Sequence, residues 1–139
     1  MKRYVNAAFL YALLAMVGGV FYREFTKLNG FTEQTVLAVV HTHYFLLGMV
    51  FFVLLVLLEK SFAFTSARTG KALIAYHAGL NLTVAMFVVR GVTQVLGTPL
   101  TSGMDAAISG VAGIGHMVLG ISLALVLWQL RRAVTAARG

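Results

Sequence analysis

The chain of 139 residues contains no cysteine, a single proline and only four acidic residues. Without cysteine it forms no disulfides or thiolate clusters and cannot attach a c-type haem covalently. Lone Pro99 leaves long stretches free of the residue that most strongly breaks helices. The sequence shows no carboxylate pair within an apolar stretch, no serine–histidine pairing and no phosphate-binding glycine loop. These absences argue against an enzyme without excluding one.

Apolar residues dominate what is present. Hydrophobic residues make up 60% of the chain and charged residues 11%. A soluble domain of this length cannot bury so much apolar surface, so the composition indicates an integral membrane protein in contact with the lipid bilayer. The net charge of +7 does not indicate a nucleic-acid partner, because the basic residues stand at the ends of the apolar runs.

Four stretches have the roughly 20 apolar residues that a membrane-spanning helix needs. They cover residues 4–22, 34–58, 72–97 and 105–130. The first resembles a secretory signal, but its apolar run is longer and lacks a small-x-small cleavage site, so we expect it to be retained. The turn signal at Gly97, Thr98 and Pro99 ends the third stretch. The sequence thus predicts one all-α domain over 1–139, an up-down-up-down transmembrane four-helix bundle.

The distribution of basic residues predicts the orientation of this bundle. One side has only Arg23 and Lys27, which Glu24, Glu33 and Asp105 offset. The other side collects Lys2, Arg3, Lys60, Arg68, Lys71, Arg131, Arg132 and Arg138. We therefore predict a multi-pass protein whose N- and C-termini both face the cytoplasm.

Three of the four histidines lie inside apolar spans, which makes them functional candidates because an imidazole is costly in hydrocarbon. They are His41 and His43 in the second span and His116 in the fourth. At about 1.5 Å of rise per residue, they lie roughly 10–15 Å below the outer surface. His77 lies on the cytoplasmic side, too far away to share a site with them, and we interpret it as a partly buried hydrogen-bonding group.

Small residues surround the histidine of the fourth span. Ser109, Gly113, His116 and Gly120 follow the spacing of one helix face. This pattern predicts a flat slot beside the imidazole, which a planar macrocycle requires. The alternative is close helix packing, for which small-xxx-small patterns are typical.

His41 shares a face with Gly48 and two phenylalanines, so the second span repeats this pairing of a histidine with a small residue. In an up-down bundle the second and fourth helices are diagonal neighbours, and bundle cores hold cofactors between facing helices. We therefore predict a haem b iron with His41 and His116 as its axial ligands. The resulting roles are electron transfer, haem handling or gas sensing.

Two alternatives remain open. The first is a copper or zinc ion bound by His41, His43 and His116, with or without Glu24. His43 lies about 200° around a regular helix from His41, so both bind one ion only if the helix is kinked or a dimer interface brings them together. In the other alternative the histidines only hydrogen-bond between helices of a non-catalytic membrane subunit, and the glycine-lined faces support a homo-oligomer. A redox partner would be needed for electron transfer, and the sequence does not identify one.

Arg90 is the one guanidinium at the depth of these histidines. One interpretation is that it extends towards the outer headgroups, with Gln94 one turn further on. The other pairs it with a haem propionate or with an acidic residue such as Glu24. We interpret Asp105 as favouring the amino-terminal end of the fourth helix through the helix dipole.

The stretch HTHYFLLGM resembles the HxHxxxxG segment in the second helix of small relatives of haem-copper oxidase subunit I. In that superfamily the first histidine is an axial ligand of the low-spin haem, and the resemblance implies this role for His41. A complete oxygen-reducing site needs more histidines than this chain has, unless subunits pool their ligands.

Over its whole length the chain resembles a family of small bacterial four-helix membrane proteins of unknown function. The stretches that carry this resemblance are YREFTKLNGFTEQT, HTHYFLLGM, VVRGVTQVLG and DAAISGVAGIGH. It implies the four-helix fold and a bacterial cytoplasmic membrane, and no established activity.

Overall fold

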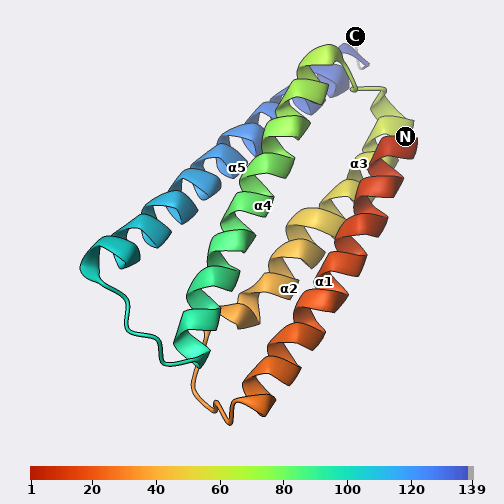
Figure 1. Cartoon of the computed structure of the whole chain (residues 1–139). Coiled ribbons are helices and arrows are strands. Elements are labelled where there is room, and N and C mark those ends of the chain that lie inside the picture. Colours follow the sequence, from red (N-terminus) through yellow and green to blue (C-terminus); the bar gives the residue numbers. More distant parts are fainter. Residues whose placement is uncertain (138–139) are drawn as a thin grey trace.

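A computed structural model describes residues 1–137 as four antiparallel helical spans (Figure 1). All four are long and apolar enough to cross a membrane, which confirms the predicted all-α bundle. The first, third and fourth spans are the helices α1 (Lys2–Leu28), α4 (Ala67–Val95) and α5 (Ser102–Ala136). The second span consists of four consecutive elements, η1 (Val36–Val39), α2 (Val40–His43), η2 (Tyr44–Val50) and α3 (Phe51–Phe62).

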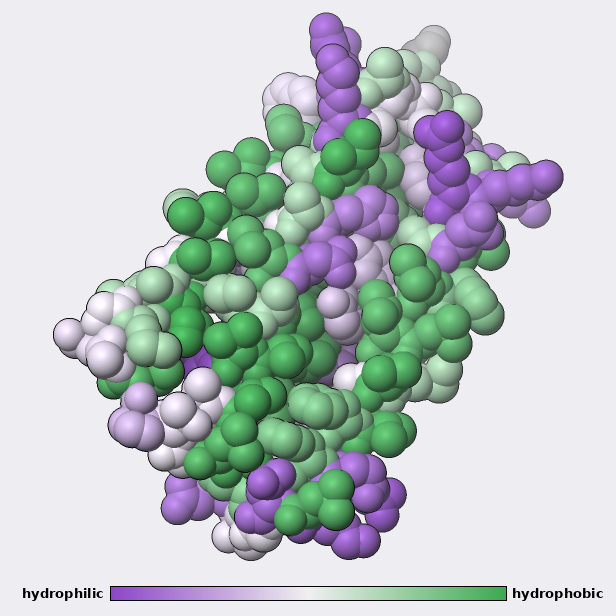
Figure 2. Space-filling model, viewed as in Figure 1, coloured by the Kyte–Doolittle hydropathy of each residue, from purple (hydrophilic) through white to green (hydrophobic). Residues whose placement is uncertain are grey.

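The two ends of the bundle differ in what they carry. Both termini lie at one end, here called the terminal end, together with the connection over 63–66 (Figure 1). The connections over 29–35 and 96–101 form the opposite, loop end. Hydrophilic residues gather at both ends of a hydrophobic band (Figure 2). The antiparallel order places seven of the eight predicted cytoplasmic cations at the terminal end, while Arg138 lies outside the described residues.

Local capping sets the helix ends. Helix α4 begins at Ala67, earlier than the predicted residue 72, because Ser66 and Thr69 form a reciprocal capping box. It ends at Val95, and Gly97 then adopts a positive φ of 61°, so the predicted turn is confirmed. Helix α3 ends on Ala63, which is left-handed at φ 45°, an unusual conformation for alanine.

Glycines allow close contacts between helices at two places in the bundle. Helices α4 and α5 meet at Gly79 and Gly115, where a Cβ added to Gly79 would lie 2.6 Å from the Leu119 nitrogen. On the other side of the bundle, α1 packs on the second span, and a Cβ added to Gly48 would lie 2.5 Å from the Tyr11 ring. Among the largest fully buried side chains are Tyr11, Leu37, Phe52, Leu55, Tyr76, Leu80, Val84 and Val126.

The second span is not a regular α-helix. It opens as a 3₁₀ turn, where Thr35 caps the chain and both the Thr35 hydroxyl and the Val36 N–H donate to Gln94 Oε1 of α4. Directly after His43 it widens into the π-helix η2. The buried Tyr76 hydroxyl donates to the Leu47 carbonyl at 2.8 Å. A side chain that enters the helical hydrogen-bond ladder is a recognised cause of such irregularity.

Candidate cofactor site

Two intramembrane imidazoles face each other from the second span and α5. The ring centroids of His43 and His116 are 6.3 Å apart and their planes are nearly perpendicular, at 88°. Phe87 of α4 lies beside both, with centroid distances of 4.9 Å to His43 and 5.6 Å to His116. His43 is half-buried and His116 is exposed on the helix surface. Three helices therefore converge on one pair of histidines.

Each of these imidazoles is anchored to its own helix in the same way. Nδ1 of His43 lies 2.8 Å from the Val39 carbonyl, and Nδ1 of His116 lies 3.0 Å from the Ala112 carbonyl. A carbonyl oxygen only accepts, so each Nδ1 carries the proton. In the neutral ring the lone pair is then on Nε2, and the second nitrogen of a metal-binding histidine is typically held in this manner.

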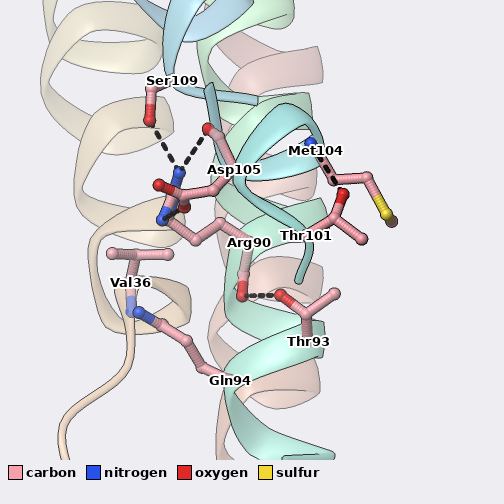
Figure 3. A network of polar contacts seen from close by, with 8 residues as sticks. All are labelled: Val36, Arg90, Thr93, Gln94, Thr101, Met104, Asp105 and Ser109. Carbon is pink, nitrogen blue, oxygen red and sulfur yellow. Dashed lines mark hydrogen bonds and ion pairs between the residues drawn. The ribbon is translucent and has the colours of Figure 1, made fainter. Parts of the chain in front are cut away.

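Arg90 lies on the face of α4 that also carries Phe87, one turn closer to the loop end. Its guanidinium forms an ion pair of 2.7 Å with Asp105 of α5 and donates to the Ser109 hydroxyl at 2.8 Å and to the Asp105 carbonyl at 3.2 Å (Figure 3). The acidic partner is thus Asp105, not Glu24 as the sequence suggested. Gln94 instead binds the start of the second span.

The two glycines beside His116 leave open space. A Cβ built on Gly113 or Gly120 meets no atom within 4 Å, and both residues are exposed. Both glycines therefore lie on the exposed face of α5 that carries His116, outside the close helix packing, and the flat slot stays a prediction. The tight helix contact on α5 comes from Gly115, which was not predicted. Gly48 lies against Tyr11 and does not line the site.

His41 points away from this pair, towards α1. A Cβ built on Gly19 would lie 3.7 Å from the His41 Cβ, and its Nδ1 is buried without a hydrogen-bond partner. Among the described residues the ring contacts place His43, and not His41, beside His116. The predicted pairing of His41 with His116 is therefore not the one that the fold brings together.

A second polar group lies between α1 and α4, nearer the terminal end. The Tyr11 hydroxyl lies 2.7 Å from His77 Nδ1 and accepts from Asn81 Nδ2 at 3.0 Å, and Tyr44 donates to Asn81 Oδ1 at 3.0 Å. The interpretation of His77 as a hydrogen-bonded group is confirmed. The sequence places Asn81 one turn from His77 on the same face, whereas the tyrosine partner of His77 was missed.

Phe87 was not predicted as a site residue. Its spacing of three residues from Arg90 places both on one helix face and would have indicated it. Within residues 1–137 no group of three or more histidine, cysteine or acidic side chains is arranged to hold a metal ion. The site thus offers two imidazoles, an aromatic ring and a guanidinium already paired with a carboxylate.

Fold and site together define a small four-helix membrane protein with a histidine pair between its helices. Residues 1–133 match the model of the family described as "Protein of unknown function (DUF2871)", so the chain belongs to that family, as its overall resemblance predicted. No curated protein and no solved structure matches the chain. The likeness of the second span to haem-copper oxidase relatives stays a prediction.

Proposed function

We propose that this protein binds haem b within the membrane, with His43 and His116 as the two axial ligands, and that it transfers electrons. The observation that carries the proposal is the pair itself. Two imidazoles that share one metal ion have ring centroids about 6 Å apart, because each metal–nitrogen bond is about 2 Å long. The separation of 6.3 Å and the two proton-bearing Nδ1 atoms fit this requirement.

The number of ligands favours haem over copper or zinc. A porphyrin supplies four nitrogens, so the protein needs to add only the two axial ligands. A zinc site takes three or four protein ligands. His41 and His43 of the HTH triplet face different neighbours, so the triplet does not provide a third ligand to the His43–His116 pair.

The remaining side chains suit a porphyrin. His43, His116 and Phe87 would hold it, beside the open face of α5 at Gly113 and Gly120. Arg90 lies one turn from Phe87 on the same face of α4, and its guanidinium would supply positive charge for a haem propionate. Bound haem would supply a one-electron couple, and two axial histidines leave no open position for a gas, which favours electron transfer.

We further propose that the protein lies in the bacterial cytoplasmic membrane with its terminal end in the cytoplasm. The support is the concentration of lysine and arginine at that end. In this orientation the histidine pair lies in the outer half of the membrane, and a redox partner would approach from that side.

Titration of the detergent-purified protein with haemin, followed at the Soret band, tests the ligand assignment. We expect one haem per chain, and we expect His43→Ala and His116→Ala each to weaken binding about tenfold or more, the range seen when metal-site groups are removed. His41→Ala is the matched control from the same helix and should bind like the unmodified chain. Loss of haem in His41→Ala with retention in His43→Ala would instead support the oxidase-like assignment and contradict ours.

A further inference from the structure

A pocket of about 250 Å³ lies at the terminal end, between the starts of α1 and α4 and the second span. Its lining residues on α4 run from Gly70 to His77. His77 lies about 15 Å along the helix axis from Ala67, the first residue of α4. In Figure 2 hydrophilic surface interrupts the hydrophobic band between α1 and α4, and the Tyr11 and His77 side chains of these helices are hydrogen-bonded. The lining residues are Met1, Arg3, Tyr4, Phe52, Glu59, Thr65, Gly70, Leu73, Ile74 and His77.

Three polar residues near the terminal end of this pocket are paired with one another. The Tyr4 hydroxyl lies 2.6 Å from the Thr65 hydroxyl, and the Thr65 N–H donates to Glu59 Oε2 at 2.9 Å. The other charged group of the lining is Arg3, which is exposed at the terminal end. Among the lining residues on α4, His77 lies furthest from the terminal end, and its imidazole supplies the polar group there.

The hydrogen-bond network of His77 indicates which of its ring nitrogens carries the proton. The Tyr11 oxygen accepts from Asn81, and the other hydrogen-bond partner of the hydroxyl among the described residues is His77 Nδ1 at 2.7 Å, so we infer that the Tyr11 proton is donated to Nδ1. In the neutral imidazole the ring proton is then on Nε2, which is a donor. Phe52 stacks on the imidazole at 4.7 Å and 7°, so the ring is held in place.

We propose that this pocket binds the ring of a membrane-soluble quinone, with a quinone carbonyl accepting a hydrogen bond from His77 Nε2–H. The pocket is at the small end of ligand sites, so it suits a ring system and not a whole lipid. Its walls are the aromatic side chains of Tyr4 and Phe52 together with Leu73 and Ile74. Ile74 lines the pocket and is 71% exposed, so the pocket adjoins the apolar surface from which a lipid-dissolved ligand would enter.

Calorimetric titration of the full-length protein in detergent with 2-methyl-1,4-naphthoquinone tests this proposal. We expect saturable one-to-one binding, and 2-methylnaphthalene, which lacks both carbonyls, should bind about tenfold more weakly or not at all. His77→Phe keeps a ring on Phe52 but removes the donor, and should weaken quinone binding about 3- to 10-fold, the usual contribution of one hydrogen bond.

A second variant keeps the test decisive if His77→Phe fails to fold. Gly70 lines the pocket and a Cβ built on it meets nothing within 4 Å, so Gly70→Leu adds a large side chain at an open position of the lining and should abolish binding. Gly103→Leu is the matched control, since Gly103 is equally open but lies on α5, away from the pocket, and its binding should be unchanged.

Equal binding of the carbonyl-free compound would show that the pocket holds only apolar chains and would overturn the proposal, as would unchanged binding in Gly70→Leu. The heat of quinone binding at this pocket does not depend on bound haem. Failure here therefore leaves the haem proposal standing, and a protein without haem leaves this proposal standing.

Discussion

At the residue scale, the assignment depends on two histidines that are two positions apart in one helix. His41 packs on the backbone of α1 next to Gly19, and His43 faces Phe87 and His116. Their spacing predicts opposite directions but does not say which of them meets α5. That choice depends on which side of the second span faces α1, and Gly48 settles it by its close approach to Tyr11.

The left-handed cap at Ala63 makes a testable prediction about stability. An L-residue in this conformation costs roughly 1–2 kcal/mol, which glycine avoids, while the added freedom of the unfolded chain takes back about 0.4–1 kcal/mol. Ala63→Gly should therefore raise the free energy of unfolding by about 0.5–1 kcal/mol, measured by unfolding in mixed detergent and SDS micelles. Ala85→Gly, at an exposed position inside α4, should lower it by a similar amount. Destabilisation by both variants would argue against the cap.

At the element scale, α4 connects the two halves of the bundle. One side of it contacts α5 through Gly79 and Thr83, and its loop end binds the second span through Gln94. The Arg90–Asp105 ion pair joins α4 to the first turn of α5. This arrangement places Phe87, and with it the histidine pair, at the junction of three helices.

The close packing of α4 on α5 makes a testable prediction. A methyl group on Gly79 would lie 2.6 Å and 2.9 Å from backbone atoms of α5, which cannot move out of its way without shifting the helix. Gly79→Ala should lower the free energy of unfolding by about 1–3 kcal/mol, the usual cost of overpacking. Gly110→Ala, where the same methyl meets nothing within 4 Å, should leave it unchanged or raise it. Equal effects of the two substitutions would contradict this packing.

Much of the element scale could be predicted from the sequence. Apolar length gave the four helices, and Gly97 and Pro99 marked the turn after α4. The π-helix could not be predicted, because it accompanies the contact from Tyr76 to Leu47, 29 residues away. The pairing of Arg90 with Asp105 was also missed, because it depends on how the connection over 96–101 folds α5 back onto α4.

At the scale of the whole molecule, the antiparallel order separates two sites along the membrane. The pocket at His77 lies towards the terminal end, and the His43–His116 pair lies towards the loop end. The proposals for the two sites are independent, yet together they describe a bundle with a ligand site near one face and a redox group nearer the other. The shared depth of His43 and His116 could be predicted from the sequence, whereas the pocket could not, because it forms only where three spans meet.

The absorption spectrum of the detergent-purified protein, air-oxidised and then reduced with dithionite, tests the central claim most directly. The account predicts a Soret band with sharp α and β bands on reduction, as two axial imidazoles give, and no shift on addition of carbon monoxide. A spectrum without a Soret band, even after the protein is supplied with haem, would contradict it.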